Sequence, residues 1–285
     1  MNIVSLRTFL AIVKTGSLVR ASEMMNVTQS TVTARLQALE AELGQTLITR
    51  NKNGATLTVA GIRLRRYAEA MTQLWAQARQ DAALPSSMSG ICNLGCETGL
   101  WEHCGSYLLE SMRRNAPTMA VSTWHGSDAN NAEWLVSGLV DVAIMYQVPP
   151  APSGLRTHAL PSDQLILVAS TPDAPIRHNS GYIYVELGAE FERLHTQAYA
   201  DADTAKLSYS HPQWALSHLL KFGGSAYLPE RIAQPHIAKG DLFLLADAPI
   251  FTRPIHLIVR DPSTAPASII DNLLPGVMAA MIATA

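Results

Sequence analysis

The chain has 285 residues, of which 48% are hydrophobic and 15% charged, a composition that predicts about two packed domains and excludes an extended disordered protein. No apolar run approaches the ~20 residues of a membrane span, and the N-terminal MNIVSLRTFLAIVK spreads its charges among apolar residues, so we expect a cytoplasmic protein with neither a signal peptide nor a membrane partner. The net charge of −2 is unevenly divided, because residues 1–90 contain ten Lys or Arg and five Asp or Glu, whereas residues 91–285 contain eleven and eighteen. This asymmetry favours a polyanionic partner for the first segment alone.

Three short helices are predicted at the N-terminus. Residues 3–14 carry apolar side chains at helical spacing, and Gly16 ends the pattern. Ser17 is a suitable N-cap for a second helix, and Thr28 for a third. One face of the third helix is apolar and consists of Val32, Leu36, Leu39 and Leu43. These helices predict a small domain with its own core.

The polar side of the third helix carries short hydrogen-bonding side chains. The row consists of Gln29, Ser30, Thr33 and Gln37, with Thr31 and Arg35 one turn apart on a flank. Such side chains suit the edges of bases, and a helix N-terminus favours phosphate. The pattern therefore predicts a helix that reads double-stranded DNA.

A β-hairpin is predicted after this helix, in the stretch TLITRNKNGATLT. Its turn is expected at Asn53 and Gly54, a strong hairpin dipeptide. Arg50 and Lys52 stand at or near its tip. A basic hairpin that follows a helix-turn-helix is a winged arrangement, in which the wing can reach phosphates or the minor groove.

One long helix is predicted from the cap Thr58 to about Ala83. Its apolar positions are Ile62, Tyr67, Met71, Leu74, Trp75 and Ala78. Alone in solution the helix would expose this apolar face, so the face packs either against a second copy of the chain or against the chain's own domain. The segment LPSSMSG that follows predicts a hinge.

Short strands alternate with helices from Ile91 onward. ICNLGC, MAVSTW and DVAIMYQ are predicted strands, separated by helices over residues 99–114 and 129–137. This βαβαβ order predicts an α/β fold with a parallel sheet. A second sheet is predicted from DQLILVAS, YIYVEL, KLSYS and SAYLP with a helix at Trp214–Lys221, and HLIVR predicts a return to the first sheet.

The N-terminal segments resemble the LysR-type transcriptional regulators. The resemblance covers about sixty residues in register, through LRTFLAIVKTGSLVRAS, VTQSTVTARLQALEAELG and TLITRNKNGATLTVAG. It implies that Thr28, Gln29 and Ser30 enter the major groove, with Thr33, Arg35, Arg50 and Lys52 as support on the DNA backbone. Leu18, Ser22 and Met25 depart from the residues usual in the family, and these packing changes leave the DNA-facing row intact.

The resemblance also implies the domain plan. It assigns residues 1–58 to a winged helix-turn-helix, 59–84 to a linker helix that pairs with its counterpart in a homodimer, 85–90 to a hinge, and 91–285 to an effector domain. The effector domain resembles periplasmic binding proteins, with lobe I over residues 91–160 and 256–285 and lobe II over 163–250. Its match is thinner and rests on GLVDVAI, SDQLILVAS and GGSAYLP. Assembly to a homotetramer is implied by the resemblance alone.

An effector site is predicted beyond the carboxyl ends of the strands, where open parallel sheets bind ligands. The residues there are Glu97, Thr98, Trp101, His125, Ser127 and Glu186, with His211 and Gln213 approaching from the other lobe. Thr98 and Ser127 match effector-binding positions of the family, although a loop Ser or Thr is also a common helix cap. These loops hold no Arg or Lys, and Glu97 and Glu186 would repel an acid, so we expect a neutral or cationic effector, or an aromatic one on Trp101 or Trp124.

Catalytic, metal and cofactor sites are not expected. All nine histidines lie in the C-terminal part, without an HExxH, a G-x-S-x-G or a phosphate-binding loop. Cys92, Cys96 and Cys104 lack a zinc or redox spacing and are expected to be small core residues.

The predicted function is that of a DNA-binding regulator whose small effector shifts the shape of a dimer of dimers, and thereby DNA bending and the access of RNA polymerase. Three alternatives stay open at this point: an N-terminal module that binds proteins, a regulator without an effector, and an enzyme that uses the C-terminal domain.

Overall fold

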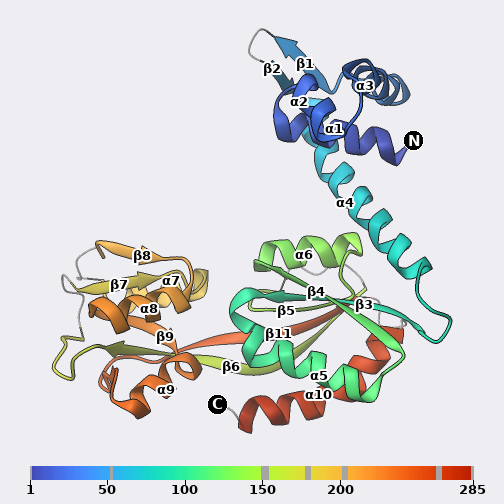
Figure 1. Cartoon of the computed structure of the whole chain (residues 1–285). Helices are drawn as coiled ribbons and strands as arrows, with labels where there is room; N and C mark the ends of the chain where they lie inside the picture. Colours follow the sequence, from blue (N-terminus) through green and yellow to red (C-terminus); the bar gives the residue numbers. More distant parts are fainter. Residues whose placement is uncertain are drawn as a thin grey trace. The chain divides into compact units, whose positions relative to one another are not determined.

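The computed structural model describes residues 2–51, 54–148, 154–176, 181–200, 205–260 and 265–283 of the chain (Figure 1). The chain divides into two compact units. One contains residues 1–90 and 137–139, and the other contains residues 91–136 and 140–285.

Three helices form the core of the N-terminal unit: α1 (Ile3–Thr15), α2 (Leu18–Met24) and α3 (Gln29–Leu43). The predicted caps are confirmed, since the hydroxyl oxygens of Ser17 and Thr28 accept hydrogen bonds from the backbone N–H groups of Arg20 and Thr31 at 3.4 and 3.3 Å. The core contains Leu6, Phe9, Ile12, Val32, Leu36 and Leu39, all buried. Leu43 is the last residue of α3 and is 42% exposed, so the apolar stripe ends one turn earlier than predicted.

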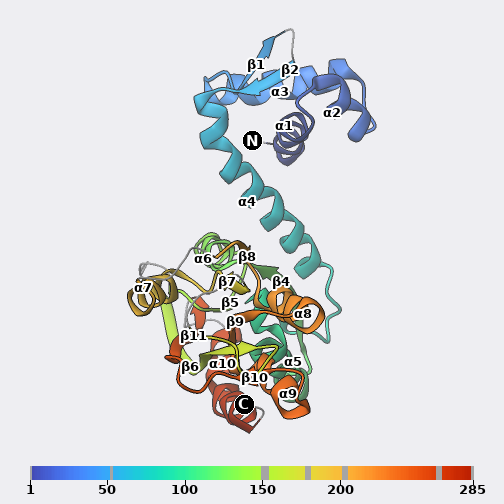
Figure 2. The same cartoon turned by 90° about the vertical axis from the view of Figure 1, so that its left-hand side faces the viewer.

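The wing is the antiparallel hairpin of β1 (Ile48–Asn51) and β2 (Gly54–Leu57) (Figure 2). Asn51 pairs with Gly54, so Gly54 belongs to β2, whereas Asn53 of the predicted turn lies outside the described residues. Gly54 has a φ of 128°, and a Cβ there would lie 2.6 Å from the carbonyl oxygen of Gly16. A glycine is therefore needed at this position both for its positive φ and because β2 lies against the loop between α1 and α2.

The long helix α4 (Val59–Ala82) begins at Thr58, whose hydroxyl accepts a hydrogen bond from Gly61 N at 3.0 Å. Only Gly61 and Ala68 of this helix are buried. Five large apolar side chains of this helix are 36–61% exposed, namely Ile62, Tyr67, Met71, Leu74 and Trp75. The chain itself therefore leaves the apolar face of α4 uncovered.

A continuous sheet runs through the C-terminal unit, in the order β4-β3-β5-β11-β6-β9-β7-β8 with β10 beside β6. The strands are β3 (Gly90–Glu97), β4 (Met119–Gly126), β5 (Val142–Met145), β6 (Leu155–Ala169), β7 (Tyr182–Val185), β8 (Leu207–Tyr209), β9 (Ser225–Pro229), β10 (Phe243–Leu244) and β11 (Phe251–Arg260). The parallel pairing predicted for the first sheet is confirmed between β3 and β5. β11 is antiparallel to both β5 and β6, so the sheet is mixed.

Helices cover this sheet in both lobes. They are α5 (Ser106–Asn115), α6 (Asp128–Ser137), α7 (Ala189–Ala198), α8 (Pro212–Phe222), α9 (Glu230–Lys239) and α10 (Ala265–Ala283). The helix predicted over residues 99–114 begins instead with a 3₁₀ turn, η1 (Thr98–Leu100), and a π-helical turn, η2 (Trp101–Gly105), ahead of α5.

Two large hydrophobic cores define the two lobes, and a smaller cluster around Leu135 of α6 adds to lobe I. Lobe I packs α5 and α10 on the sheet around residues such as Leu94, Ile144, Leu257 and Ile270, while lobe II packs α7, α8 and α9 around residues such as Leu167, Ile183, Leu216 and Tyr227. β6 and β11 run through both lobes, and the register of their pairing shifts between Arg253 and Ile255. The three cysteines are free and buried in lobe I, as predicted.

The C-terminal helix α10 is a core helix of lobe I. Its segment Pro266–Ala283 is the one helix among the described residues that is long and apolar enough to cross a membrane by length and composition. However, Ile270, Val277 and Met281 are buried in the core of lobe I. This burial accounts for the apolar composition of one face.

Candidate DNA interface and interlobe site

The start of α3 presents the predicted polar row. Gln29 and Ser30 are exposed, and Thr31 is half-buried. The Thr28 hydroxyl lies 2.9 Å from the hydroxyl of Ser30 and 2.8 Å from that of Thr31. These hydroxyl groups are thus held together at the helix N-terminus, where the first backbone N–H groups have no partner within the helix.

The flank of α3 and the wing carry the basic residues. Thr33 and Arg35 are half-buried on α3, on the two flanks of the face that carries the buried Val32 and Leu36. Arg50 is exposed on β1, opposite Ala55 of β2. Lys52 lies outside the described residues. The Glu40 carboxylate, which accepts hydrogen bonds from Leu47 N at 2.7 Å and Ile48 N at 3.2 Å, fastens the end of α3 to the start of the wing.

The first predicted effector residues follow β3. Oε2 of Glu97 accepts a hydrogen bond from Gly99 N at 2.8 Å, and burial raises the pKa of Glu97 above its usual range. Thr98 is exposed. The ring of Trp101 lies against Gly105, where a Cβ would be 2.6 Å from it, and packs on the core of lobe I. Trp101 therefore has a packing role within its own lobe.

Of the remaining predicted residues, His125 lies near the end of β4, Ser127 follows β4 and Glu186 follows β7. His125 and Glu186 are exposed. Ser127 caps α6, because its hydroxyl oxygen accepts a hydrogen bond from Asn130 N at 3.3 Å and lies 2.9 Å from Asn130 Oδ1. The contacts of Ser127 are therefore those of a helix cap, which is the other role that the sequence analysis gave for a serine in this loop.

His211 of lobe II approaches lobe I. Its Nδ1 accepts a hydrogen bond from Gln213 N at 3.2 Å, which leaves the proton of the neutral ring on Nε2. A Cβ on Gly99 would lie 3.8 Å from that Nε2, which is buried and has no hydrogen-bond partner within the described part of the chain. Burial, together with the charges of Arg231 and Arg253, lowers the pKa of His211.

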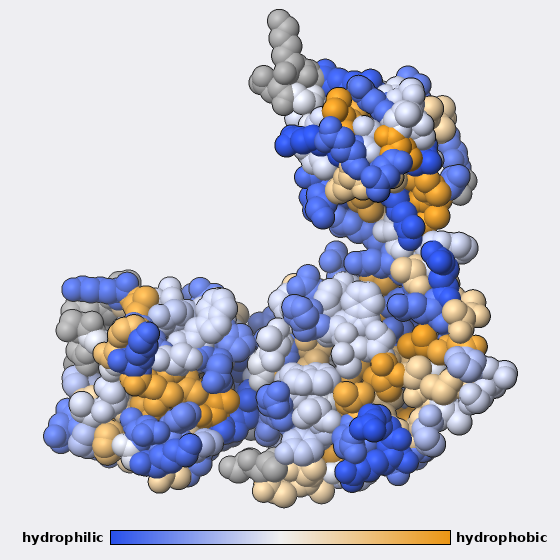
Figure 3. All heavy atoms as spheres, viewed as in Figure 1, coloured by the Kyte–Doolittle hydropathy of each residue, from blue (hydrophilic) through white to orange (hydrophobic). Residues whose placement is uncertain are grey.

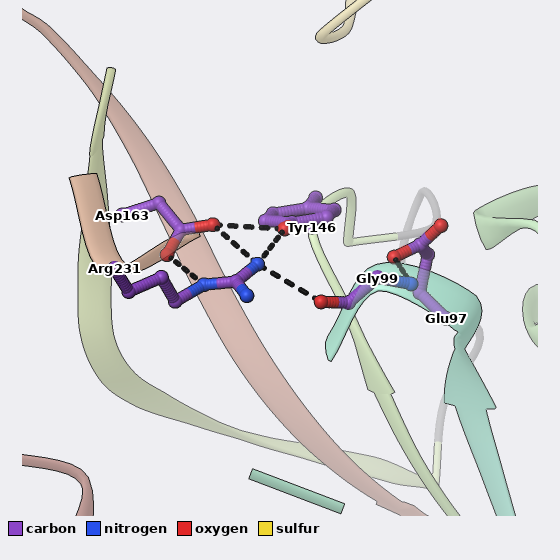
Figure 4. A network of polar contacts seen from close by, with 5 residues as sticks. All are labelled: Glu97, Gly99, Tyr146, Asp163 and Arg231. Atoms are coloured by element: carbon purple, nitrogen blue, oxygen red, sulfur yellow. Dashed lines mark hydrogen bonds and ion pairs between the residues drawn. The ribbon is translucent and has the colours of Figure 1, made fainter. Parts of the chain in front are cut away.

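An arginine that the sequence analysis did not single out joins the lobes (Figure 4). Arg231, on α9, donates from Nε to Asp163 Oδ1 at 2.7 Å and from Nη2 to Asp163 Oδ2 at 3.2 Å. The same Nη2 donates to the carbonyl oxygen of Gly99 at 2.9 Å and contacts the hydroxyl of Tyr146 at 3.2 Å, and that hydroxyl donates to Asp163 at 2.8 Å. A side chain of lobe II thus binds the backbone of lobe I.

This network is buried, with 10% of the Arg231 side chain and 2% of the Asp163 side chain exposed. Burial alone would lower the pKa of Arg231, but the charge of Asp163 outweighs it and raises that pKa. Burial and the same carboxylate raise the pKa of Tyr146. Because a buried charge without its partner is costly, each member of the network depends on the others.

A small pocket of about 70 Å³ lies at the crossover between the lobes. It is lined by Tyr146, Gln147, residues 187–191 and Thr252, Arg253 and Pro254. None of the six predicted effector residues lines it. The guanidinium carbon of Arg253 lies 3.3 Å from the centroid of the Tyr146 ring. The loops considered in the sequence analysis hold no Arg or Lys. However, Arg231 on α9 and Arg253 on β11 lie where the two lobes meet. The argument against an acidic effector counted only the loop residues and was therefore incomplete.

Metal and thiol chemistry have little support in this unit. Within the described ranges, no three His, Cys, Asp or Glu side chains are grouped so that they could hold a metal ion. Burial raises the pKa of Cys92 and of Cys104 to about 12, so these thiols stay protonated and inert near neutral pH.

Comparison with known families matches both units. Residues 3–62 match the bacterial regulatory helix-turn-helix protein family of LysR type, and residues 85–271 match the LysR substrate binding domain. The chain belongs to the LysR family of transcriptional regulators. Each of the two units of this LysR-type regulator therefore matches a domain that is typical of the family.

Individual relatives agree with this assignment. The regulator is 28% identical over 277 residues to the HTH-type transcriptional regulator HdfR of Salmonella newport, across 96% of this chain and 97% of that protein. Among solved structures it is similar to full-length CbnR in complex with its target DNA (TM-score 0.72, 19% identity, 99% of this chain and 100% of that chain). It is also similar to LysG of Corynebacterium glutamicum with bound effector Arg (TM-score 0.54, 18% identity, 99% and 98%).

Proposed function

We propose that this regulator binds a specific double-stranded DNA sequence with Gln29, Ser30 and Thr31 at the start of α3, supported by Thr33, Arg35 and the wing residues Arg50 and Lys52. The observation that carries the proposal is the exposed polar row of α3, whose opposite face is buried in the core of the unit. Side-chain amides and hydroxyls recognise base edges, and arginines bind phosphates. The related CbnR was solved in complex with its target DNA.

The test is DNA binding by the wild type and by the double variant Gln29→Ala, Arg35→Ala, with fragments from the regulator's own upstream region at fixed salt. A variant that loses a base contact and a phosphate contact should bind at least about tenfold more weakly. A matched control is Gln197→Ala, Arg113→Ala, since both residues are exposed in the other unit. Equal binding by the α3 variant and the control would contradict the proposal.

The oligomer in this proposal is a homodimer formed through α4, with a homotetramer as the larger assembly. Tyr67, Met71, Leu74 and Trp75 recur at helical spacing on α4 and are exposed in the single chain. A second copy would remove this face from water. Lobe II also exposes Trp214, Leu220 and Phe222 on α8. Figure 3 shows hydrophobic residues gathered on one face of lobe II. Such patches are typical of contact surfaces between proteins.

We further propose that the C-terminal unit binds a small effector between its two lobes and catalyses no reaction. The proposed residues lie at or just beyond the carboxyl ends of three strands: Glu97 and Thr98 at the end of β3, His125 and Ser127 at the end of β4, and Glu186 after β7. Trp101 packs within lobe I close to the first of them. Effector binding would favour one relative position of the lobes and thereby alter DNA bending and the access of RNA polymerase in the cytoplasm. The related LysG was solved with a bound effector.

A second candidate is a DNA-binding regulator without an effector. The buried contacts of Arg231 with Gly99 and Tyr146 favour it, because they already hold the lobes together, and the pocket at the crossover is only about 70 Å³. A thermal-shift screen of small molecules separates the two candidates. Stabilisation by one chemical class supports the sensor, whereas a uniform absence of stabilisation favours the second candidate.

A further inference from the structure

We infer that Arg253 and Gln147 form an anion subsite at the crossover, which selects an effector that carries a single carboxylate. The inference rests on the proposed effector role of the interlobe site, and it names the chemical class of the ligand.

Among the described residues, the Arg253 guanidinium has no carboxylate in direct contact, although its charge acts on Glu97 and Asp128. No carboxylate lies within 4.0 Å of it in the described ranges, and it takes part in none of the hydrogen bonds found there. It is instead held flat on the Tyr146 ring, 3.3 Å from the ring centroid. This stacking fixes the guanidinium but leaves its N–H donors unpaired. An arginine in this state at the wall of a pocket is prepared to bind an anion.

Several donors lie next to Gly188. A Cβ added to Gly188 would lie 3.7 Å from Gln147 Nε2, 3.9 Å from Arg253 Nη2 and 4.0 Å from Arg253 Nε. Three side-chain nitrogens therefore lie near the same side of Gly188, where the missing side chain leaves room in the pocket. An oxyanion in the pocket beside Gly188 could accept hydrogen bonds from Arg253 and from the amide of Gln147.

The backbone of α7 adds to this environment without being the basis of the inference. α7 begins after Gly188, has no side-chain cap, and its first residues, Ala189 to Phe191, line the pocket. Their N–H groups have no carbonyl partner within the helix. The carboxylate of Glu190, also in this turn, is bound by Arg193 at 2.6 and 2.9 Å, so its charge is already paired.

The acidic groups of lobe I limit the charge of the ligand. Glu97 and Asp128 both interact with the charge of Arg253, and burial raises the pKa of each. A ligand with two or more negative charges would be repelled by these carboxylates, whereas one carboxylate at Arg253 would be compensated. The pocket of about 70 Å³ has room for about two waters, or for one carboxylate whose parent molecule extends into the cleft.

The test compares acids with their uncharged amides on the full chain: acetate with acetamide, benzoate with benzamide, and N-acetylglycine with its amide. Each is added to the wild type and to Arg253→Gln, Arg253→Lys and Gln147→Ala, with the exposed Arg113→Gln as matched control. Thermal shift gives the preference for acid over amide, and calorimetry gives Kd. Circular dichroism verifies that each variant is folded.

We expect the wild type and Arg113→Gln to prefer the acid of at least one pair. Arg253→Gln should bind that acid about tenfold or more weakly and lose the preference, and Arg253→Lys should retain part of it. The inference is overturned if no pair shows an acid preference in the wild type, or if the preference survives in Arg253→Gln. Stabilisation by amides alone would overturn the subsite and leave the effector role standing, while DNA binding by the α3 variants tests the regulator independently.

Discussion

The start of α3 and the interlobe site are the two places for which a function is proposed, and they are built in opposite ways. Thr28, Ser30 and Thr31 hold one another within a single turn of chain, so the DNA-facing row is formed by neighbours in sequence. The contacts of Arg231 join Gly99, Tyr146 and Asp163 from segments far apart in the chain. The first surface could be predicted from the sequence because its hydrogen bonds are local. The second forms only when the chain folds, because its residues come from distant segments.

The two sites also differ in how they respond to damage. The α3 row is exposed, so a lost hydrogen bond there is replaced by water. The Arg231 network is buried, so a lost partner leaves a charge without solvent. We therefore expect substitutions in the network to affect stability and substitutions in the row to affect recognition.

The largest effect is expected for Asp163→Ala. It leaves the Arg231 guanidinium buried without a counter-ion, and we expect the free energy of unfolding of the C-terminal unit to fall by about 3–5 kcal/mol. Urea denaturation followed by tryptophan fluorescence measures this change. The double variant Asp163→Leu, Arg231→Met should recover most of the loss, since it removes both charges together. A loss below about 1 kcal/mol in Asp163→Ala would show that the network does not hold the lobes.

A smaller and local effect is expected for Thr28→Ala. This substitution removes the N-cap of α3 and should lower the stability of its first turn by about 1 kcal/mol. Hydrogen exchange of the α3 amides in the full chain measures the change. Thr46→Ala, at an exposed position before the wing, is the control. If exchange rose equally in lobe I, the effect would not be local and the contrast between the two sites would fail.

The smallest effect is a pH dependence at Glu97. Burial raises its pKa in the folded state above the unfolded value of about 4.3, so the folded protein favours the protonated carboxyl. This contribution to stability is present below the unfolded pKa and is lost as the pH rises through the folded pKa. Glu97→Gln should therefore unfold at higher urea concentration than the wild type at pH 7, with the difference shrinking toward pH 4. Glu186→Gln, at an exposed position, is the matched control.

The N-terminal unit could be predicted in most of its detail because its signals are local. Ser17, Thr28 and Thr58 are caps that act on residues three positions away, and each was recognised. The exception is the turn of the wing. Gly54 was assigned to a tight turn, but it pairs with Asn51 in the hairpin, and the need for glycine there comes from its positive φ and from its approach to Gly16, a residue far away in the sequence.

The C-terminal unit was predicted in outline only. Apolar strands and their parallel pairing could be recognised, but β6 and β11 are longer than their apolar runs, because each continues from one lobe into the other. The helices α7, α9 and α10 were not predicted.

Asp163 and Arg231 each stand at the edge of an apolar strand run, in SDQLILVAS and after SAYLP. A charge in that position is often buried and paired, which is the signal that could have identified them. Arg253 gives no such signal in the sequence, because it lies within β11 and its role depends on the point at which that strand crosses between the lobes.

The passage of β6 and β11 through both lobes has a consequence for engineering and for the exchange of parts between relatives. Lobe II is an insertion whose two connections to lobe I are strands paired with each other, from Leu155 opposite Arg260 to Leu165 opposite Phe251. A chimera that exchanges lobe II must therefore cut both strands at matched register, because a cut displaced by one residue turns every later side chain to the opposite face. Lobe II can therefore be transferred only if both strands are rejoined within the sheet. The position of the cut in β11 decides whether Arg253 moves with lobe II or stays with lobe I.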